Sequence, residues 1–212
     1  MARIPVPPQA TDTMTVAQLD RRRRVLDAVI ELVAQGRFDD VGMKEIGERS
    51  GVALGTIYRY FSSKDHVAAA ALAAWAATLD PRPGGDGAPA AWADGGTMAD
   101  RLVAILRRAV RAYQRQPAFA RLLILAATST DPFASECYRE MGDRVYTTLG
   151  AALGELDPAD RRRVLDVVGP VWYQALIEWV NDRKTIAQVY DAVEDAARLV
   201  LAGFEYHLRG KP

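Results

Sequence analysis

The chain contains very little cysteine and histidine, which limits the covalent and metal-bound frameworks that it can form. Cys137 is the one cysteine among 212 residues, so no disulfide can form within the chain. His66 and His207 are the two histidines, too few to complete a structural zinc site with that cysteine. We therefore predict a protein of a reducing compartment that binds neither a metal nor a cofactor, and in which Cys137 is a small hydrophobic residue.

Long apolar runs and an excess of one charge are also missing. No window approaches the roughly 18 uninterrupted apolar residues that a membrane span needs, and residues 1–15 have no apolar signal-peptide core. The 27 basic and 27 acidic side chains give a net charge of zero, so overall charge does not indicate nucleic-acid binding. Because 50% of the residues are hydrophobic, we expect a cytoplasmic globular protein of one or two domains.

Proline and glycine mark the breaks along the chain. Residues 1–19 contain three prolines and no apolar periodicity, which predicts a flexible arm with order beginning near Asp20. A helical pattern then runs to residue 79. The Pro- and Gly-rich stretch from Asp80 to Gly96, with Trp92 inside it, predicts a loop.

Helix-start signals divide the rest of the chain. Thr97 and Thr185 each precede a polar partner at capping-box spacing, and Asp131 and Asp157 each stand before a proline at the first helical position. These signals predict helices over 98–115, 117–128, 132–153, 158–182 and 186–207. Pro170 should kink or split the fourth of them. No stretch alternates at period two for long enough to form a strand, so we predict an all-α fold of about nine helices.

Three short helices are predicted between Leu26 and Phe61. The apolar residues of the first recur with the spacing of one helix face, and Gly36 ends it. The second covers residues 43–50 and stops at Gly51, whose tolerance of positive φ suits a sharp turn. The third begins near Ala53. Two short helices joined by a tight turn form a helix–turn–helix, so we predict that residues 20–66 are a DNA-binding domain.

The second helix of such a motif can enter the major groove of DNA. Its outward candidates combine hydroxyl groups, one guanidinium and a glycine that permits close approach: Leu54, Gly55, Thr56, Tyr58, Arg59 and Tyr60. The two tyrosines cannot both face the interior with Ile57 and Phe61, so at least one should face outward. No acidic residue lies in this stretch, and the run Arg21–Arg24 nearby is either a basic arm that reaches phosphates or a solvated helix start.

A family match gives the most specific signal. Residues 51–61 have the sequence GVALGTIYRYF, and Ser63-Lys64-Asp65 follows. This stretch resembles the tetracycline-repressor (TetR) family of bacterial regulators, and the match covers residues 21–67. The resemblance implies a homodimer that binds operator DNA, contacts from Lys44, Lys64 and the face Leu54–Tyr60 to that DNA, and an effector pocket in the C-terminal helices.

The sequence also indicates a subgroup within this family and departs from the family pattern at two glycines. The run ALGTIYRYFSSK, with Val171-Trp172 and Glu178-Trp179, is similar to the actinobacterial regulators of cholesterol and lipid catabolism. Gly42 stands where the TetR family often has a Ser or Thr helix cap, and Gly47 stands where alanine is usual in that family. Both departures predict a weaker helix over residues 43–50.

The C-terminal helices carry enough inward apolar residues either to line a cavity or to fill a core. The resemblance favours effector contact for a set of these residues: Trp75, Leu102, Leu106, Phe119, Leu123, Tyr138, Met141, Val145 and Trp172. Arg107, Arg111 and Arg115 lie on one helix face, where they either meet solvent or bind an acidic head group. We therefore predict that residues 67–212 form a ligand-binding and dimerisation domain.

The segment 158–182 is apolar over most of its circumference, so it should be enclosed on several sides. Together with residues 186–207 it offers a surface for pairing with a second copy of the chain. The predicted dimer interface contains Trp179, Val193, Val200 and Phe204.

These observations predict a ligand-responsive transcriptional repressor, released from its operator by a small apolar effector of the lipid, steroid or acyl-CoA type. The alternatives are an activator of the same family and a helical lipid-binding or interaction module that does not bind DNA. An enzyme is not supported, because the sequence contains no nucleophile–base pair, phosphate-binding loop or metal motif.

Overall fold

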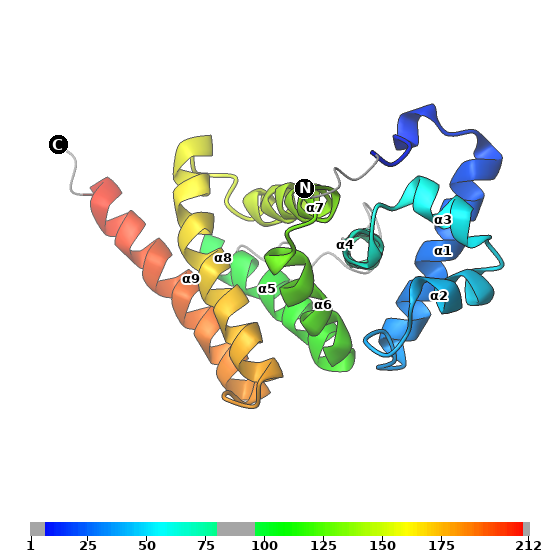
Figure 1. Ribbon diagram of the computed structural model, residues 1–212. Coiled ribbons are helices and arrows are strands. Elements are labelled where there is room, and N and C mark those ends of the chain that lie inside the picture. Colours follow the sequence, from blue (N-terminus) through cyan, green and yellow to red (C-terminus); the bar gives the residue numbers. More distant parts are fainter. Residues whose placement is uncertain (1–6, 80–95, 210–212) are drawn as a thin grey trace. The chain divides into compact units, whose positions relative to one another are not determined.

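The computed structural model describes residues 7–79 and 96–209, with side chains as far as Phe204. Within these residues the chain is all-α, which confirms the predicted fold class (Figure 1). The elements there are η1 (Thr11–Thr13), α1 (Val16–Ala34), α2 (Met43–Ser50), α3 (Leu54–Tyr60), α4 (Lys64–Ala77), α5 (Met98–Arg115), α6 (Pro117–Thr128), α7 (Pro132–Ala151), α8 (Pro158–Val180) and α9 (Ile186–Arg209). The predicted loop from residue 80 to 95 with Trp92, residues 1–6 of the predicted arm, and the His207 side chain lie outside the described residues.

The chain forms two compact units. The first consists of residues 1–78 and 121–141, and so combines α1–α4 with most of α6 and the first half of α7. The second consists of residues 79–120 and 142–212, which include α5, α8 and α9. The packing therefore does not divide at residue 66, where we placed the boundary between the two functions, and that functional division stays a prediction.

Helix boundaries follow the capping signals. The Thr97 hydroxyl accepts the Asp100 N–H and the Asp100 carboxylate accepts the Thr97 N–H, which completes the predicted capping box of α5. Thr185 pairs with its partner in the same way at α9, and Asp157 caps α8 ahead of Pro158. The predicted bounds of α5 and α6 are confirmed, and α7, α8 and α9 agree within two residues.

The N-terminal segment is ordered earlier than its composition predicts. Helix α1 begins at Val16, because Thr15 and Gln18 form a capping box that our prediction overlooked. Before it, η1 forms a turn and Met14 is only 9% exposed. The expectation of a flexible arm up to residue 19 is therefore wrong for residues 7–19, since a cap and a buried methionine fix this stretch.

Helix α8 continues through Pro170, so the predicted split at this proline is wrong. The proline ring removes only the hydrogen bond to the carbonyl four residues earlier, at Asp166. Both residues are exposed, so water can supply the missing donor and the rest of the helix keeps its own hydrogen bonds.

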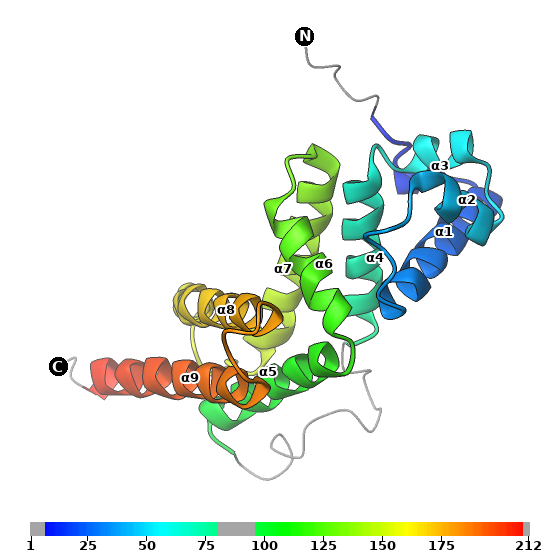
Figure 2. The same cartoon turned by 60° about the horizontal axis from the view of Figure 1, so that its bottom comes forward.

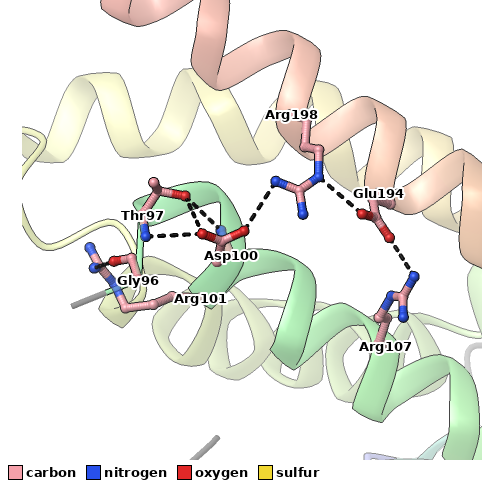
Figure 3. A network of polar contacts seen from close by, with 7 residues as sticks. All are labelled: Gly96, Thr97, Asp100, Arg101, Arg107, Glu194 and Arg198. Carbon is pink, nitrogen blue, oxygen red and sulfur yellow. Dashed lines mark hydrogen bonds and ion pairs between the residues drawn. The ribbon is translucent and has the colours of Figure 1, made fainter. Parts of the chain in front are cut away.

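In the second unit α9 packs against both α5 and α8 (Figure 2). Its buried residues recur every four positions from Val189 to Leu201, which gives one apolar stripe along the helix. Beside this stripe runs a chain of charged groups in which Arg198 donates to Asp100 (3.1 Å) and to Glu194 (3.0 Å), and Glu194 also accepts from Arg107 (Figure 3). Such exposed ion pairs contribute little free energy, so the buried stripe supplies most of the packing of α9 and the charged groups lie along its edge.

Candidate nucleic-acid interface

Helices α2 and α3 of the first unit form the predicted helix–turn–helix. Helix α2 ends at Gly51, whose φ of +64° lies in the left-handed region that favours glycine. Gly47 is buried beside the turn, and a Cβ added there would lie 3.0 Å from the carbonyl oxygen of Val52. Gly42 and Ala53 provide no side-chain cap for α2 and α3. The turn is thus held by close backbone packing rather than by helix capping.

Helix α3 presents one face to solvent. Leu54 is 39% exposed and Tyr58 is 50% exposed, which is unusual for large apolar and aromatic side chains. Gly55 and Arg59 are also exposed, and Thr56 is half-buried. We define these five residues as the recognition face. It combines an apolar side chain, two hydroxyl groups and a guanidinium, and groups of these kinds contact base edges in the major groove.

Tyr60 does not belong to this face. Its side chain is 2% exposed, so our prediction that it meets DNA is wrong. Tyr60 and Phe61 lie three and four residues after Ile57, and this spacing brings all three to the buried side of α3. The expectation that at least one tyrosine faces outward is met by Tyr58.

Two lysines predicted to contact DNA lie on the flanking helices. Lys44 on α2 is largely exposed, with its ammonium 3.6 Å from Glu48. Lys64 begins α4, where its ammonium donates to the Asp39 carbonyl (3.2 Å) and lies 4.6 Å from the centre of the Phe38 ring. An ammonium group carries three N–H donors, so this contact leaves donors of Lys64 for a phosphate. DNA contact by either lysine stays a prediction.

The four arginines Arg21–Arg24 of α1 do not form one basic arm. Arg23 and Arg24 each lie near an aspartate one helical turn away. Arg22 instead turns inward, with its guanidinium 5.1 Å from the centre of the Phe61 ring, and burial lowers its pKa from the usual value. Arg22 therefore belongs to the packing of the first unit, and the interpretation of the whole run as an arm on phosphates is wrong for this residue.

A group of polar residues around the buried His66 follows the recognition helix, and we refer to it as the polar junction. His66 is 6% exposed, and its Nδ1 accepts a hydrogen bond from the Ser62 N–H (3.1 Å). The Ser62 hydroxyl donates to Asp131 (2.9 Å), and the Ser129 hydroxyl donates to Asp65 (2.6 Å). These hydrogen bonds join the α3–α4 turn to the α6–α7 turn within the first unit.

The surroundings of His66 hold its imidazole neutral. Its ring stacks on Phe133, with 5.7 Å between ring centres, and meets the edge of Phe61 at 5.3 Å. Burial lowers the pKa of His66 to about 4, against the attraction of nearby Asp131. Burial also acts to raise the pKa of Asp131, but hydrogen bonds, the Ser63 hydroxyl first among them, outweigh it and hold that pKa below its usual value.

We expect this neutral histidine to make stability depend on pH between 7 and 5. The unfolded chain takes up a proton near the usual pKa of 6.5, whereas the folded protein does so only near pH 4. Acidification to pH 5 therefore favours the unfolded state by about 2 kcal/mol. Urea unfolding at the two pH values measures the loss. The variant His66→Asn, whose amide Oδ1 takes the place of Nδ1 and can still accept the Ser62 N–H, should show little of it. An equal loss in the variant would assign the effect to other groups.

The residues predicted to line an effector site are divided between the units. The first unit contains Trp75, Leu123, Tyr138 and Met141, and the second contains Leu102, Leu106, Phe119, Val145 and Trp172. Six of them are at most 7% exposed, while Tyr138, Val145 and Trp172 are half-buried. Trp172 differs from the others because its indole Nε1 is buried and has no acceptor among the described residues. Its ring lies 6.2 Å from that of Tyr113, in the same unit. Effector contact stays a prediction for all nine.

The arginine stripe on α5 is partly used within the second unit. Arg107 donates to Glu194 and lies 5.9 Å from the centre of the Tyr190 ring, so its guanidinium helps to hold α9 on α5. Arg111 and Arg115 are exposed. A head-group contact therefore stays a hypothesis for these two, and Arg107 already has a structural role.

The predicted dimer interface needs one correction. Val193 is 0% exposed within the subunit, where it belongs to the α9 stripe, so it is not available to a second copy and its assignment is wrong. Trp179, Val200 and Phe204 are half-buried and remain predictions. In the described parts of α8 and α9 the exposed large apolar side chains are Val167 (50%), Val171 (36%) and Leu199 (74%).

The described residues lack the features of three other kinds of site. No helix among them is long and apolar enough to cross a membrane. They contain no group of three His, Cys, Asp or Glu side chains placed to hold a metal ion. Burial raises the pKa of Cys137 to about 11, so this residue stays a thiol and lacks the thiolate that makes a cysteine reactive.

The fold and the recognition face define a helix–turn–helix DNA-binding protein. The family model for bacterial regulatory proteins of the tetR family matches residues 25–71, and that for the tetracyclin repressor-like C-terminal domain matches residues 95–200. The chain belongs to the TetR family of transcriptional regulators. It is thus a DNA-binding regulator whose N-terminal match contains the recognition face.

Individual relatives extend the comparison along most of the chain. The transcriptional repressor KstR of Rhodococcus jostii (strain RHA1) is 31% identical over 191 residues, 90% of this chain and 87% of the relative. A solved TetR regulator from Rhodococcus sp. RHA1 is 27% identical, with a TM-score of 0.71, over 87% of this chain and 96% of that one. Thermus thermophilus FadR, a repressor solved with lauroyl-CoA, shares the fold at 18% identity and a TM-score of 0.66, over 85% and 93% of the two chains.

Proposed function

We propose that this protein is a homodimeric repressor that binds operator DNA through α3 and leaves it when an apolar effector binds. The recognition face carries the DNA-binding part of this proposal. Leu54 and Tyr58 are exposed there although they are large, Arg59 adds a cation, and no acidic residue lies between Ala53 and Ser63. The repressor named among the relatives supports repression over activation.

Exposed apolar groups on α8 and α9 support the homodimer. Val167, Val171 and Leu199 leave apolar surface on two neighbouring helices of the second unit. Pairing of α8 and α9 with the same helices of a second copy would cover this surface in a two-fold four-helix arrangement. Two recognition helices would then contact half-sites about 34–36 Å apart, one turn of DNA.

The second unit supports an apolar effector that carries a hydrogen-bond acceptor. Trp172 has a buried indole N–H without an acceptor among the described residues, beside the ring of Tyr113. An unsatisfied buried donor costs roughly 1–3 kcal/mol, so a ligand carbonyl or hydroxyl at this position would bind favourably. Lauroyl-CoA, the ligand of the FadR structure, is an apolar chain with such a carbonyl, and a steroid ketone is another.

The two binding events are coupled in this proposal. The effector binds better to a conformation in which the two recognition helices have the wrong separation for the half-sites. By linkage, operator DNA must weaken effector binding by the same factor by which the effector weakens operator binding. We propose no enzymatic reaction, and we place the protein in the cytoplasm, where its DNA target lies.

The test combines selection of DNA with competition by effectors. The protein selects duplexes from a random-sequence pool, and fluorescence anisotropy then compares the selected duplex with a scrambled one at two salt concentrations. We expect the selected duplex to bind about 1,000-fold more tightly or better. Lauroyl-CoA or cholesterol should release it, whereas coenzyme A, which lacks the acyl chain, should not.

Three outcomes would change the proposal. Equal affinity for both duplexes would favour the interaction module that does not recognise DNA. Direct binding of lauroyl-CoA with unchanged operator affinity would remove the effector from the mechanism. A reporter gene downstream of the selected duplex whose expression rises with the protein would favour an activator.

A further inference from the structure

We propose that residues 7–15, the N-terminal segment, position the recognition helix for sequence-specific DNA binding. The segment connects the last turn of α3 to the first turn of α1 within the first unit. This inference rests on the proposed DNA-binding function. It assigns to the segment a role in specificity without contact to DNA.

Helix α3 needs support from outside itself. It contains seven residues, whereas an isolated helix is only marginally stable below about 12–15 residues. Ala53 offers no side-chain cap at its start, and Gly55 in its first turn lowers helix propensity by about 1 kcal/mol relative to alanine. The position of the recognition face therefore depends on what holds the two ends of this helix.

The N-terminal segment holds the C-terminal end. The last carbonyl groups of a helix have no donor within the helix. The carbonyl of Arg59 accepts a hydrogen bond of 2.9 Å from the backbone N–H of Gln9, a residue far away in the sequence. Arg59 is itself on the recognition face, so this hydrogen bond acts directly on a residue that is expected to meet DNA.

The other end of the segment is fixed to α1. The side-chain amides of Gln9 and Gln18 donate to each other, each at 3.4 Å. Gln18 also accepts the Thr15 N–H (2.8 Å) in the capping box that begins α1. Between these contacts Met14 is buried, and the Thr13 hydroxyl donates to the Ala10 carbonyl (2.7 Å). Gln9 thus joins the end of α3, through its backbone N–H, to the start of α1, through its side chain.

We expect the segment to act on DNA binding through geometry rather than through charge. It carries one acidic residue, Asp12, and no lysine or arginine, so it offers no cation to a phosphate. Non-specific binding depends on phosphate neutralisation and would not change without the segment. Contacts to base edges need placement within about 0.5 Å, so sequence-specific binding would weaken.

Two substitutions at one position separate the backbone donor from the side chain. Gln9→Pro removes the N–H that Arg59 accepts, and Gln9→Ala keeps this N–H, while both lose the amide pair with Gln18. We expect Gln9→Pro to bind the selected operator about 3- to 10-fold more weakly than Gln9→Ala, the usual value of one hydrogen bond. Affinity for the scrambled duplex and its dependence on salt should be the same in both variants.

Hydrogen exchange on the free protein tests the same contact without DNA. The Tyr60 and Phe61 amides, in the last turn of α3, should exchange faster in Gln9→Pro than in Gln9→Ala, with α4 amides unchanged. If Gln9→Pro lowers the melting temperature, a chain that starts at Met14 and keeps the Thr15–Gln18 cap is compared in both measurements with one that starts at Pro7, because both lack Arg3.

Each result supports or overturns the inference. Equal operator affinity in the two variants, or equal exchange rates in α3, would overturn it. An equal loss on scrambled DNA would overturn it as well, because the segment would then act as a general DNA contact. If selection yields no preferred duplex, the proposed function fails, and faster exchange in Gln9→Pro would still assign the contact to the stability of α3.

Discussion

Replacing Tyr58 with alanine is expected to weaken binding to the selected operator by about 10- to 100-fold. This range corresponds to the 1–3 kcal/mol that a good base contact contributes. The melting temperature should not change, because half of this side chain is exposed and its neighbour Ile57 supplies the buried contact of α3. Fluorescence anisotropy on the selected and scrambled duplexes, together with thermal unfolding, measures both effects.

Two further variants separate base contact from charge. Lys64→Ala should weaken binding to both duplexes equally and reduce the salt slope by about one, because a lysine that contacts phosphate does not distinguish sequences. Arg163→Ala removes an exposed cation on α8 and should change neither affinity. If Tyr58→Ala left operator affinity intact, the recognition face would have to be placed elsewhere.

Replacing Leu199 with glutamate is expected to separate the proposed dimer and to lower operator affinity by 100-fold or more. Leu199 is 74% exposed in the subunit, so the substitution leaves the fold of one copy unaffected. In the dimer it would bury a carboxylate without a partner, at a cost of several kcal/mol. A monomer contacts one half-site and loses the gain from linking two binding events. Sedimentation velocity at micromolar concentration gives the mass, and anisotropy gives the affinity.

Gln188→Glu is the matched control for this prediction. It adds the same charge to the same helix at an exposed position near the start of α9, and glutamate keeps the oxygen that accepts the Thr185 N–H in the capping box. We expect it to remain dimeric and to bind the operator normally. A Leu199→Glu protein that kept the mass of a dimer would show that the interface does not contain this part of α9.

Local hydrogen bonds made the helix boundaries predictable. A capping box depends on two residues three positions apart, so Thr97–Asp100 and Thr185–Gln188 could be identified without any knowledge of packing. The same applies to Asp157 before Pro158 and to the turn at Gly51. The recognition face was predictable for a similar reason, because helical spacing and the family match point to the same residues.

Orientation within α3 was harder to predict than its location. Tyr58 and Tyr60 are chemically identical, and two positions along a helix differ by about 200° in direction. The sequence therefore required one tyrosine to face outward without deciding which. The contacts of α3 with α1 and α2 decide it, because they bury Ile57 and Tyr60 on the same side.

Contacts between distant residues were missed altogether. Gln9 meets Arg59, and Ser62 meets Asp131, through single hydrogen bonds that leave no pattern in one sequence. The start signal at Asp131-Pro132 was recognised, but the second partner of the same carboxylate was not. For Val193 the apolar spacing was correct, yet spacing alone does not distinguish a contact within the subunit from one between two copies.

The backbone of the turn passes close to Gly47, so a side chain that would stabilise α2 at this position would also press on the turn that leads into α3. Alanine would raise the helix propensity of α2 by about 1 kcal/mol, and it is the residue that a consensus of the family would suggest. The added methyl group would meet the Val52 carbonyl at 3.0 Å, and Val52 lies in the turn that leads into α3. Relief of this contact would alter the angle between the two helices. The gain in helix propensity at Gly47 and the tight contact in the turn therefore act in opposite directions, so the melting temperature of a consensus variant would rise by less than the helix alone predicts.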